Sequence, residues 1–241
     1  VNLNESDPNY DIKQLALECS TKRMYPDILN YDKTVELLGD FKAPMGCRSF
    51  LPAWKDKDGH YENNGRCNLG VVTLNVPRIA LESKGDMEAF WKIFHQRMAI
   101  MHDALVYRIE RIAQATPENA PILYQNGAFK HRLKETDDIM TLFKGQRATL
   151  SIGYIGLYEA ATVFYGPHWE RLSKAKAFTL DILKSMKAYQ LKWTEQYDIW
   201  FSIYSTPSES LTDRFCRLDR EQFGEIADIT DKGYYQNSFH Y

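Results

Sequence analysis

The sequence predicts an α/β protein built as one domain around a largely parallel sheet. Short apolar runs rich in β-branched residues lie near residues 71, 121, 149 and 199. Patterns with helical spacing lie between these runs. Strands that alternate with helices form parallel sheets with helical crossovers. No internal repeat and no linker rich in proline or glycine divides the 241 residues, so one domain is the simplest organisation.

The first part of the chain is predicted to contain little regular structure. Apolar residues at helical spacing predict a short helix over residues 11–19. A proline makes residues 24–29 an extended edge, and residues 30–44 are expected to be connecting sequence. Residues 55–64 are polar and contain an Asp-Gly pair, which predicts a turn.

The middle of the chain carries a buried strand followed by a long helix. Residues 71–76 form an almost continuous apolar run that Pro77 closes, which predicts a strand covered on both faces. Asn75 stands out because an amide inside such a strand needs a hydrogen-bond partner. Asp86 is a suitable N-cap for a helix over residues 87–114, whose apolar residues keep a spacing of three to four.

The remaining elements follow the same alternation. In order, the patterns predict a strand at 121–125, a short helix from Asp138 to 143, a strand at 148–156, helices at 157–164 and 173–197, and a strand at 199–204. The glycines of strand 148–156 indicate that another group approaches its backbone closely. Residues 230–241 are expected to form a turn and a final extended piece.

The turn after strand 199–204 has the signals of a helix start. Thr206 is predicted as the N-cap, Pro207 as the first helical residue, and Glu209 as the partner that completes a capping box, with the helix ending near Asp219. Unpaired N–H groups at such a start can bind a phosphate group. The candidate phosphate ligands are Ser205, Thr206, Ser208, Glu209 and Ser210. A helix that is only well capped explains the same residues.

The composition excludes several classes of protein. A net charge of −2 gives no sign of a nucleic-acid surface or a basic membrane patch. No apolar run is long enough to span a membrane, and the polar start does not resemble a signal peptide. The four cysteines are scattered without a CxxC pair, which argues against a structural zinc site and predicts free thiols in a reducing cytoplasm.

The segment Ala43–Leu51 predicts a constrained loop with a sulfur at its tip. Pro44 and Gly46 shape the backbone around Cys47. Nucleophilic thiolate chemistry would need a nearby base, and Arg48 cannot accept a proton. One-electron chemistry needs no base, but a buried structural thiol fits the same residues. His95 and His102 are two helical turns apart, and histidines that are exposed or satisfied by ordinary hydrogen bonds are favoured over a pair of metal ligands.

Several motifs resemble the large subunit of the anaerobic (class III) ribonucleoside-triphosphate reductases, which are glycyl radical enzymes. They keep their order from about Leu17 to the end of the chain. The matching segments are residues 44–51, 65–81, 120–125, 151–156, 204–209, 213–216 and 230–235.

The resemblance implies a fold and a set of site residues. The family fold is a ten-stranded α/β barrel with a central cysteine finger loop, and residues 1–241 would form its second half. Cys47 would carry the thiyl radical that abstracts the 3′-hydrogen of a ribonucleoside triphosphate. Met45 and Asn68 would line the pocket for substrate and for formate, the implied reductant. Ser49 would stand where the aerobic enzymes carry a glutamate, consistent with the use of formate. The turn at 205–210 would receive the substrate phosphates.

The resemblance also implies cofactors and partners. These are a glycyl radical installed by a radical SAM activating enzyme, a structural zinc, ATP and deoxynucleotide effectors, the remainder of the reductase chain, and a cytoplasmic homodimer. The glycyl radical loop, the four-cysteine zinc ribbon, the N-terminal barrel half and the ATP cone have no match in these residues, and no metal ligands are expected here. The chain alone is therefore expected to be inactive. The alternatives are a non-catalytic fragment that binds nucleotide or pairs with another chain, and another glycyl radical enzyme.

Overall fold

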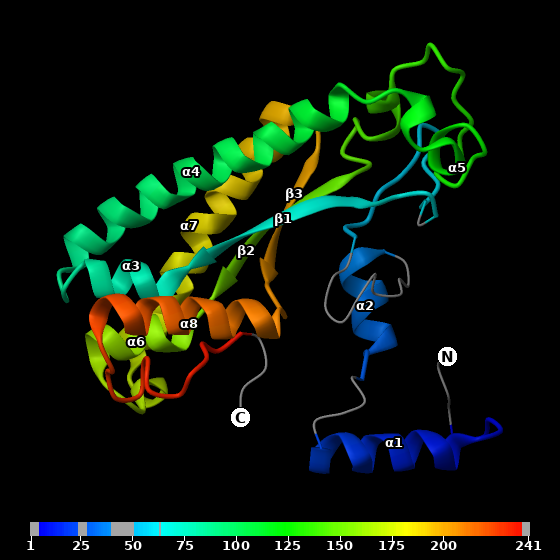
Figure 1. Cartoon of the computed structure of the whole chain (residues 1–241). Helices are drawn as coiled ribbons and strands as arrows, with labels where there is room; N and C mark the ends of the chain where they lie inside the picture. The colour runs from blue at the N-terminus through cyan, green and yellow to red at the C-terminus, as the bar shows by residue number, and fades with distance from the viewer. Residues whose placement is uncertain (1–4, 24–27, 40–50, 63, 238–241) are drawn as a thin grey trace.

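A three-stranded parallel sheet forms the centre of the molecule. The computed structural model describes residues 5–23, 28–39, 51–62 and 64–237. The strands are β1 (Asn68–Asn75), β2 (Thr149–Ile155) and β3 (Trp200–Ser205), and they lie in the order β1-β2-β3 (Figure 1). Both pairs are parallel, as the alternation of strands and helices predicts.

Helices make all the connections between the strands. In chain order the helices are α1 (Tyr10–Arg23), α2 (Tyr31–Leu38), α3 (Val76–Glu82), α4 (Met87–Ala113), α5 (Pro121–Tyr124), α6 (Leu157–Tyr165), α7 (Ser173–Tyr197) and α8 (Glu209–Phe223). Short 3-10 turns lie at Pro117–Asn119, Ile139–Leu142 and Trp169–Arg171. The elements α3 to α5 connect β1 to β2, and α6 and α7 connect β2 to β3 (Figure 1).

The main hydrophobic core lies between one face of the sheet and the two long helices. Helix α4 packs against β1 and helix α7 against β3. The two helices also contact each other, since the rings of Phe90 and Phe178 lie 5.1 Å apart. Leu150, Ile152 and Phe201 point into this core from β2 and β3 and are fully buried. The apolar stripes predicted for both helices therefore cover a single face of the sheet.

The opposite face of the sheet carries a group of small and polar side chains at its centre. Side chains alternate between the two faces of a strand, so Ser151 and Gly153 lie on the face opposite Leu150 and Ile152. The register pairs Ser151 with Ser202 and Thr73 with Gly153. This polar face is the surface on which the candidate site is built.

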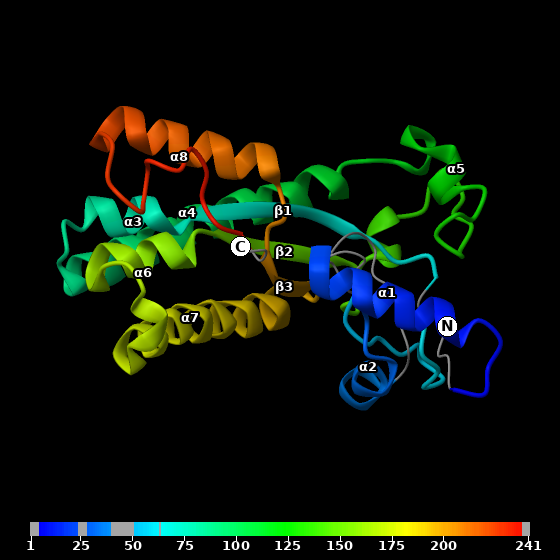
Figure 2. The ribbon, with the colours of Figure 1, turned by 90° about the horizontal axis from the view of Figure 1, so that it is seen from below.

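A second, smaller core holds α8 and the C-terminal segment. It consists of Ile155, Cys216, Ile229 and Tyr235, which are all buried. Helix α8 and the C-terminal segment lie together beside the carboxyl ends of the strands, close to α3 and α6 (Figures 1 and 2). The position of α8 thus depends on the C-terminal segment as well as on the sheet.

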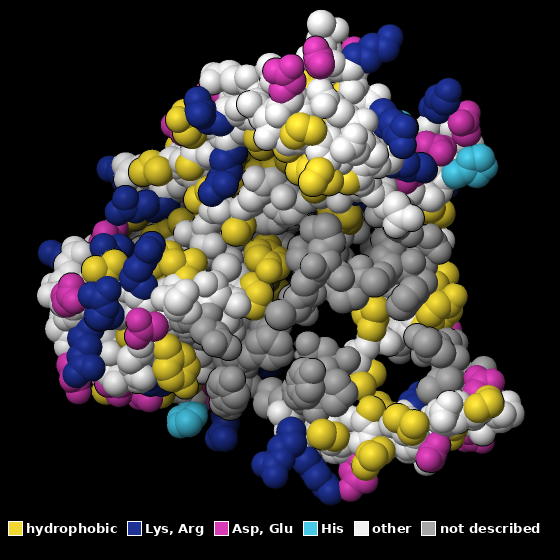
Figure 3. All heavy atoms as spheres, turned by 45° about the vertical axis from the view of Figure 1, so that its right-hand side comes forward, with side chains coloured by type: hydrophobic (Ala, Val, Ile, Leu, Met, Phe, Trp, Pro, Cys, Tyr) yellow, Lys and Arg dark blue, Asp and Glu magenta, His cyan; other side chains and the backbone are white. Residues whose placement is uncertain are grey.

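The N-terminal helices stand apart from the sheet and its covering helices (Figure 1). Helix α1 has no buried residue, and Ile12 and Leu15 are exposed on it. Apolar side chains accordingly lie on the surface of this helix at the bottom of the view in Figure 3. Among the described residues, no helix has the length and apolar character needed to cross a lipid bilayer.

Two predictions about the elements are wrong. The segment predicted as a strand at 121–125 is helix α5, because Pro121 suits a first helical position and the Gln125 N–H donates to its carbonyl at 2.8 Å. Ile122 is 71% exposed, so the apolar run is not a core strand. Residues 30–44 are not only connecting sequence, because Asn30 caps helix α2 by accepting from the Lys33 N–H.

The helix start at Thr206 is also predicted wrongly. Strand β3 continues through Ser205, and the Thr206 N–H donates to the Tyr154 carbonyl at 3.1 Å, so residue 206 still belongs to the sheet. Helix α8 begins at Glu209 with Ser208 as N-cap, and it ends at Phe223, beyond Asp219. Thr206 is therefore not the N-cap of the predicted capping box, and Ser208, which is the N-cap, makes no side-chain capping bond.

Candidate active site

A row of polar side chains crosses the sheet at Asn68. The Asn68 side-chain amide donates to the Ser151 hydroxyl at 2.6 Å, and the Ser151 and Ser202 hydroxyls lie 3.2 Å apart. The side-chain oxygen of Asn68, Oδ1, accepts from the Gly70 N–H at 2.7 Å, which fixes the orientation of the side-chain amide. The row therefore joins all three strands and holds the amide of Asn68 in one place on the polar face.

A second polar pair lies two residues further along β2. The hydroxyls of Thr73 and Thr206 are 2.9 Å apart, directly over Gly153. A Cβ at position 153 would lie 2.4 Å from the Thr206 hydroxyl and 2.6 Å from that of Thr73, so only glycine fits without a shift. The separation along the strand places this pair roughly 7 Å from the Asn68 row. The close approach predicted from the glycines of this strand is thus confirmed.

The segment that leads into α8 brings three serines to the same end of the sheet. Ser205 and Ser208 are half-buried, and Ser210 is exposed. The first N–H groups of a helix have no acceptor within the helix, and the Ser208 side chain does not supply one here. Backbone donors and hydroxyls are the groups that bind phosphate at helix starts. The side chain of Glu209 is outside the described part of the structure.

The structure brings together two of the predicted groups of site residues. Asn68 and Thr206 lie on one face of one sheet, where Asn68 bonds Ser151 and Thr206 bonds Thr73 over β2. Cys47, Met45 and Ser49 lie outside the described residues, as does the rest of the predicted finger loop at 43–50. Their predicted positions remain predictions.

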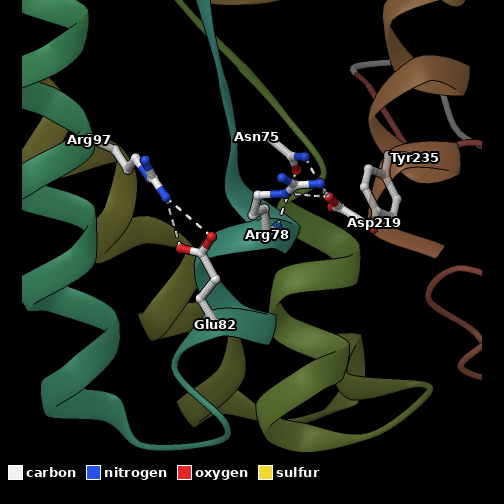
Figure 4. Close-up of polar contacts among 6 residues, drawn as sticks. All are labelled: Asn75, Arg78, Glu82, Arg97, Asp219 and Tyr235. Atoms are coloured by element: carbon white, nitrogen blue, oxygen red, sulfur yellow. Dashed lines mark hydrogen bonds and ion pairs between the residues drawn. The ribbon is translucent and has the colours of Figure 1, made fainter. Parts of the chain in front are cut away.

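A buried ionic cluster lies next to this face, at the end of β1 (Figure 4). Asp219 of α8 is fully buried and accepts hydrogen bonds from Asn75, Arg78 and Tyr235. Asn75 also caps α3 by accepting from the Arg78 N–H at 3.2 Å. The amide that looked out of place in a strand therefore has partners on both sides. The surroundings of Tyr235, above all its burial, strongly raise its pKa, and the neighbouring Asp219 adds to the shift.

Glu159 is a second buried carboxyl group at this end of the sheet. It lies in the first turn of α6, and Oε1 accepts from the Gln236 N–H at 3.1 Å. The Gly156 N–H donates to the Gln236 carbonyl at 2.7 Å, so Gly156 and Glu159 each form a hydrogen bond with the backbone of Gln236 in the C-terminal segment. Burial raises the pKa of Glu159 to about 7. Its Oε2 atom is buried and has no hydrogen-bond partner.

Two cysteines, Cys67 and Cys216, and two histidines, His95 and His102, have structural surroundings. Burial raises the pKa values of the Cys67 and Cys216 thiols to about 11, so both stay protonated near neutral pH. His95 lies 2.9 Å from the Tyr189 hydroxyl, and His102 lies 2.8 Å from that of Tyr197, so each joins α4 to α7. Within the described ranges, no three His, Cys, Asp or Glu side chains are grouped so that they could hold a metal ion.

Sequence reasoning missed the side chains that connect the site. Ser151 and Ser202 could have been found, because each is a hydroxyl between two apolar residues of a predicted strand. Asp219 could not have been found in this way. Its partner Asn75 is 144 residues away along the chain, and nothing in the local pattern of α8 distinguishes Asp219 from an exposed acid.

Comparisons with known proteins agree on one family. The family model described as anaerobic ribonucleoside-triphosphate reductase matches residues 1–241. Proteins of that name from Salmonella typhimurium, Escherichia coli and Enterobacteria phage T4 are 52%, 50% and 48% identical to 97%, 100% and 100% of this chain. The chain spans 33%, 34% and 39% of the lengths of these three relatives.

Solved structures give the same result at lower identity. The anaerobic ribonucleotide reductase from Thermotoga maritima with citrate in the active site has a TM-score of 0.58 at 26% identity, over 77% of this chain and 32% of that chain. Another anaerobic ribonucleotide reductase has a TM-score of 0.59 at 26% identity, over 77% of this chain and 28% of that chain. With its whole length matched by the family model, this chain belongs to the anaerobic ribonucleoside-triphosphate reductase family.

Proposed function

We propose that this chain is the part of an anaerobic ribonucleotide reductase that binds the ribonucleoside triphosphate and carries its radical cysteine. The observation that supports the proposal most directly is the shared polar face. Asn68 and Thr206, which belong to two groups predicted separately, lie on one side of the sheet, where Asn68 bonds Ser151 and Thr206 bonds Thr73. Family membership supplies the reaction, the reduction of the ribonucleotide to the 2′-deoxyribonucleotide.

The proposed chemistry starts at Cys47. Its sulfur, as a thiyl radical, takes the 3′-hydrogen of the ribose and forms an S–H bond, which leaves the radical on the sugar. Asn68 binds the ribose side of the substrate with an amide that Ser151 and Gly70 hold in place. Met45 is proposed to line the same pocket, and Ser49 is proposed to act there beside Cys47. Formate is proposed as the reductant, and amide and hydroxyl donors such as those of Asn68 and Ser202 suit a small carboxylate.

The substrate phosphates are proposed to lie at the start of α8. Ser205, Thr206, Ser208, Glu209 and Ser210 surround this start and would supply hydroxyl and backbone N–H groups. The Ser208 side chain makes no capping bond, which supports this proposal, because the first N–H groups of α8 are then available to another acceptor. Thr206 contributes by its bond to Thr73, which seats the turn on β1.

The proposal extends to the whole reductase. The described sheet would be three strands of one half of the ten-stranded barrel, since β1 and β3 are its two edges within the described residues. The glycyl radical, structural zinc and effector sites would lie in the remainder of the reductase, which would be a cytoplasmic homodimer served by a radical SAM activating enzyme. The open edges equally favour the second candidate, a segment that binds nucleotide and pairs with another chain without taking part in catalysis.

The first test is Cys47→Ala in the full-length reductase. We expect the loss of deoxynucleotide formation, because alanine cannot carry the radical, with substrate binding largely retained. Cys19→Ala is the matched control, since Cys19 is an exposed free thiol on α1, and it should keep full activity. Product formation is measured by chromatography after anaerobic activation. Substantial product from the Cys47 variant would refute the radical role and favour the non-catalytic alternative.

A further inference from the structure

Helix α8 presents an unusual inner stripe to the rest of the molecule. Its buried residues are Thr212, Cys216 and Asp219, and none of these has a large apolar side chain. Leu211 and Phe215 are half-buried beside them. Apolar contact is non-directional, so the contacts of Leu211 and Phe215 alone do little to fix the position of α8 along its axis. The position of α8 must therefore be set mainly by directional bonds.

The strongest of these bonds converge on Asp219 (Figure 4). The Asn75 amide donates to Oδ2 at 3.0 Å, and the Tyr235 hydroxyl donates to the same atom at 2.8 Å. Arg78 donates to Oδ1 through Nε at 2.5 Å and forms an ion pair with it through Nη2. The Arg78 guanidinium also lies 6.0 Å from the centre of the Phe223 ring, at the end of α8. Buried charges bonded in this way hold a specific geometry.

The Asp219 cluster and the helix start are attached to the same strand. Asn75 is the last residue of β1, and Thr73, which bonds Thr206, lies two residues before it. Asn68 begins that strand. Helix α3 is also bonded to helix α4, because Arg97 of α4 donates to both carboxylate oxygens of Glu82 of α3 at 3.1 and 3.0 Å (Figure 4). The start of α8 is thus held at a fixed place relative to Asn68.

We propose that Asp219 is a positioning residue for the substrate triphosphate. By holding α8 against Asn75 and Arg78, it sets the distance between the phosphate-binding start of α8 and the strand that carries Asn68. The inference rests on the proposed function, in which that helix start receives the phosphates. Asp219 itself touches no substrate, because it is fully buried in the third turn of α8.

The test is Asp219→Asn in the full-length reductase. Loss of the ionic partner of Arg78 should shift α8, so we expect the KM for the triphosphate to rise about tenfold with a much smaller change in kcat. The inhibition constant of the unphosphorylated ribonucleoside, which has no phosphate to misplace, should stay unchanged. Glu221→Gln is the control on the same helix, since Glu221 is exposed and pairs only with Arg217 among the described residues.

A double variant provides the rescue. Asn75→Asp with Asp219→Asn exchanges the amide and the carboxylate while keeping the charge of the cluster. The carboxylate introduced on β1 can still cap α3, and the amide introduced on α8 can donate to that carboxylate and accept from Arg78. We expect this pair to recover most of the triphosphate affinity. Tyr235→Phe removes one bond to Asp219 without changing the charge, and it should raise the KM in the same direction by a smaller factor.

Each outcome separates positioning from a merely structural role. Equal losses for the triphosphate and the nucleoside, or an unchanged KM in both Asp219→Asn and Tyr235→Phe, would overturn the inference. If Asp219→Asn does not fold, the KM of Tyr235→Phe decides. Ser205→Ala and Ser208→Ala test the underlying function. If the two serine variants lower the affinity for the triphosphate relative to the nucleoside, and the Asp219 and Tyr235 variants do not, only the positioning role fails. If they do not lower it, the phosphate site fails as well.

Discussion

At the scale of single residues, Glu159 is a carboxyl group whose charged form the fold disfavours. It is fully buried in the first turn of α6, and one of its oxygens has no partner. Burial raises its pKa, while Lys232 opposes the shift. The result is a carboxyl group that stays partly protonated near neutral pH and whose other oxygen accepts from the backbone of the C-terminal segment.

This carboxyl group predicts a pH-dependent stability. The pKa of Glu159 rises from an ordinary value of 4.5 to about 7 in the folded state. The folded protein therefore binds more protons than the unfolded chain between these values, and its stability falls as the pH rises through that window. Glu159→Gln should remove this part of the slope, on the order of 2 kcal/mol between pH 5 and pH 8. Urea unfolding at both pH values measures it.

The exposed Glu195 on α7 supplies the comparison for this measurement. Glu195→Gln should keep the wild-type slope. An identical slope in the Glu159→Gln protein would show that Glu159 titrates normally and would contradict the raised pKa.

Single residues also show how far sequence reasoning reaches. Asn75 and the glycines of strand 148–156 stand out in the sequence because they are unusual in buried strands, and Asn75 and Gly153 each prove to have a specific contact. The prediction that Thr206 is a helix N-cap is wrong. Its hydroxyl suits a helix cap equally well, and only the folded sheet shows that it bonds Thr73. The cluster around Asp219 joins residues far apart in the sequence, so it becomes visible only once the chain is folded.

At the scale of elements, the long helices were the most predictable. Helix α7 has the predicted bounds, and α4 differs from its prediction by one residue at its end. Long periodic patterns average over many residues, whereas short segments such as α5 and α2 depend on one or two capping groups. The start of α4 shows this capping directly, because Asp86 accepts from the N–H groups of Glu88 and Ala89.

This capping contact predicts the effect of a single substitution. Asp86→Ala should lower the free energy of unfolding by about 1 kcal/mol, because two backbone donors at the start of α4 lose their acceptor. Asp86→Asn keeps a side-chain oxygen and should stay close to the wild type. Thermal unfolding of the three proteins compares them. A loss of the same size in both variants would show that the charge matters and not the capping bond.

At the scale of the whole molecule, the parallel sheet and its helical crossovers agree with the prediction, and only the strand expected at 121–125 is missing from it. The site is less complete, because Cys47 and its neighbours lie outside the described residues. The chain spans about a third of the length of its reductase relatives.

This coverage leads to a prediction for the isolated chain. The 241-residue protein, purified alone and supplied with formate and a ribonucleoside triphosphate, should form no deoxynucleotide, because Cys47 would receive no radical. The full-length reductase, treated in the same way with its activating enzyme, should form it. Anaerobic product analysis compares the two. Turnover by the isolated chain would contradict the proposed division of roles.

The pairing of the strands also has a consequence for how the chain folds. Val72 on β1 pairs with Ile152, and Ile152 pairs with Ile203, so every sheet contact joins segments separated by at least one long helix. Closing such loops costs entropy before any pairing is gained, which makes a fold of this kind slow to form. During synthesis, β1 and the apolar stripe of α4 emerge before β2 and have no strand partner until it follows. Over that interval the new chain is most exposed to aggregation.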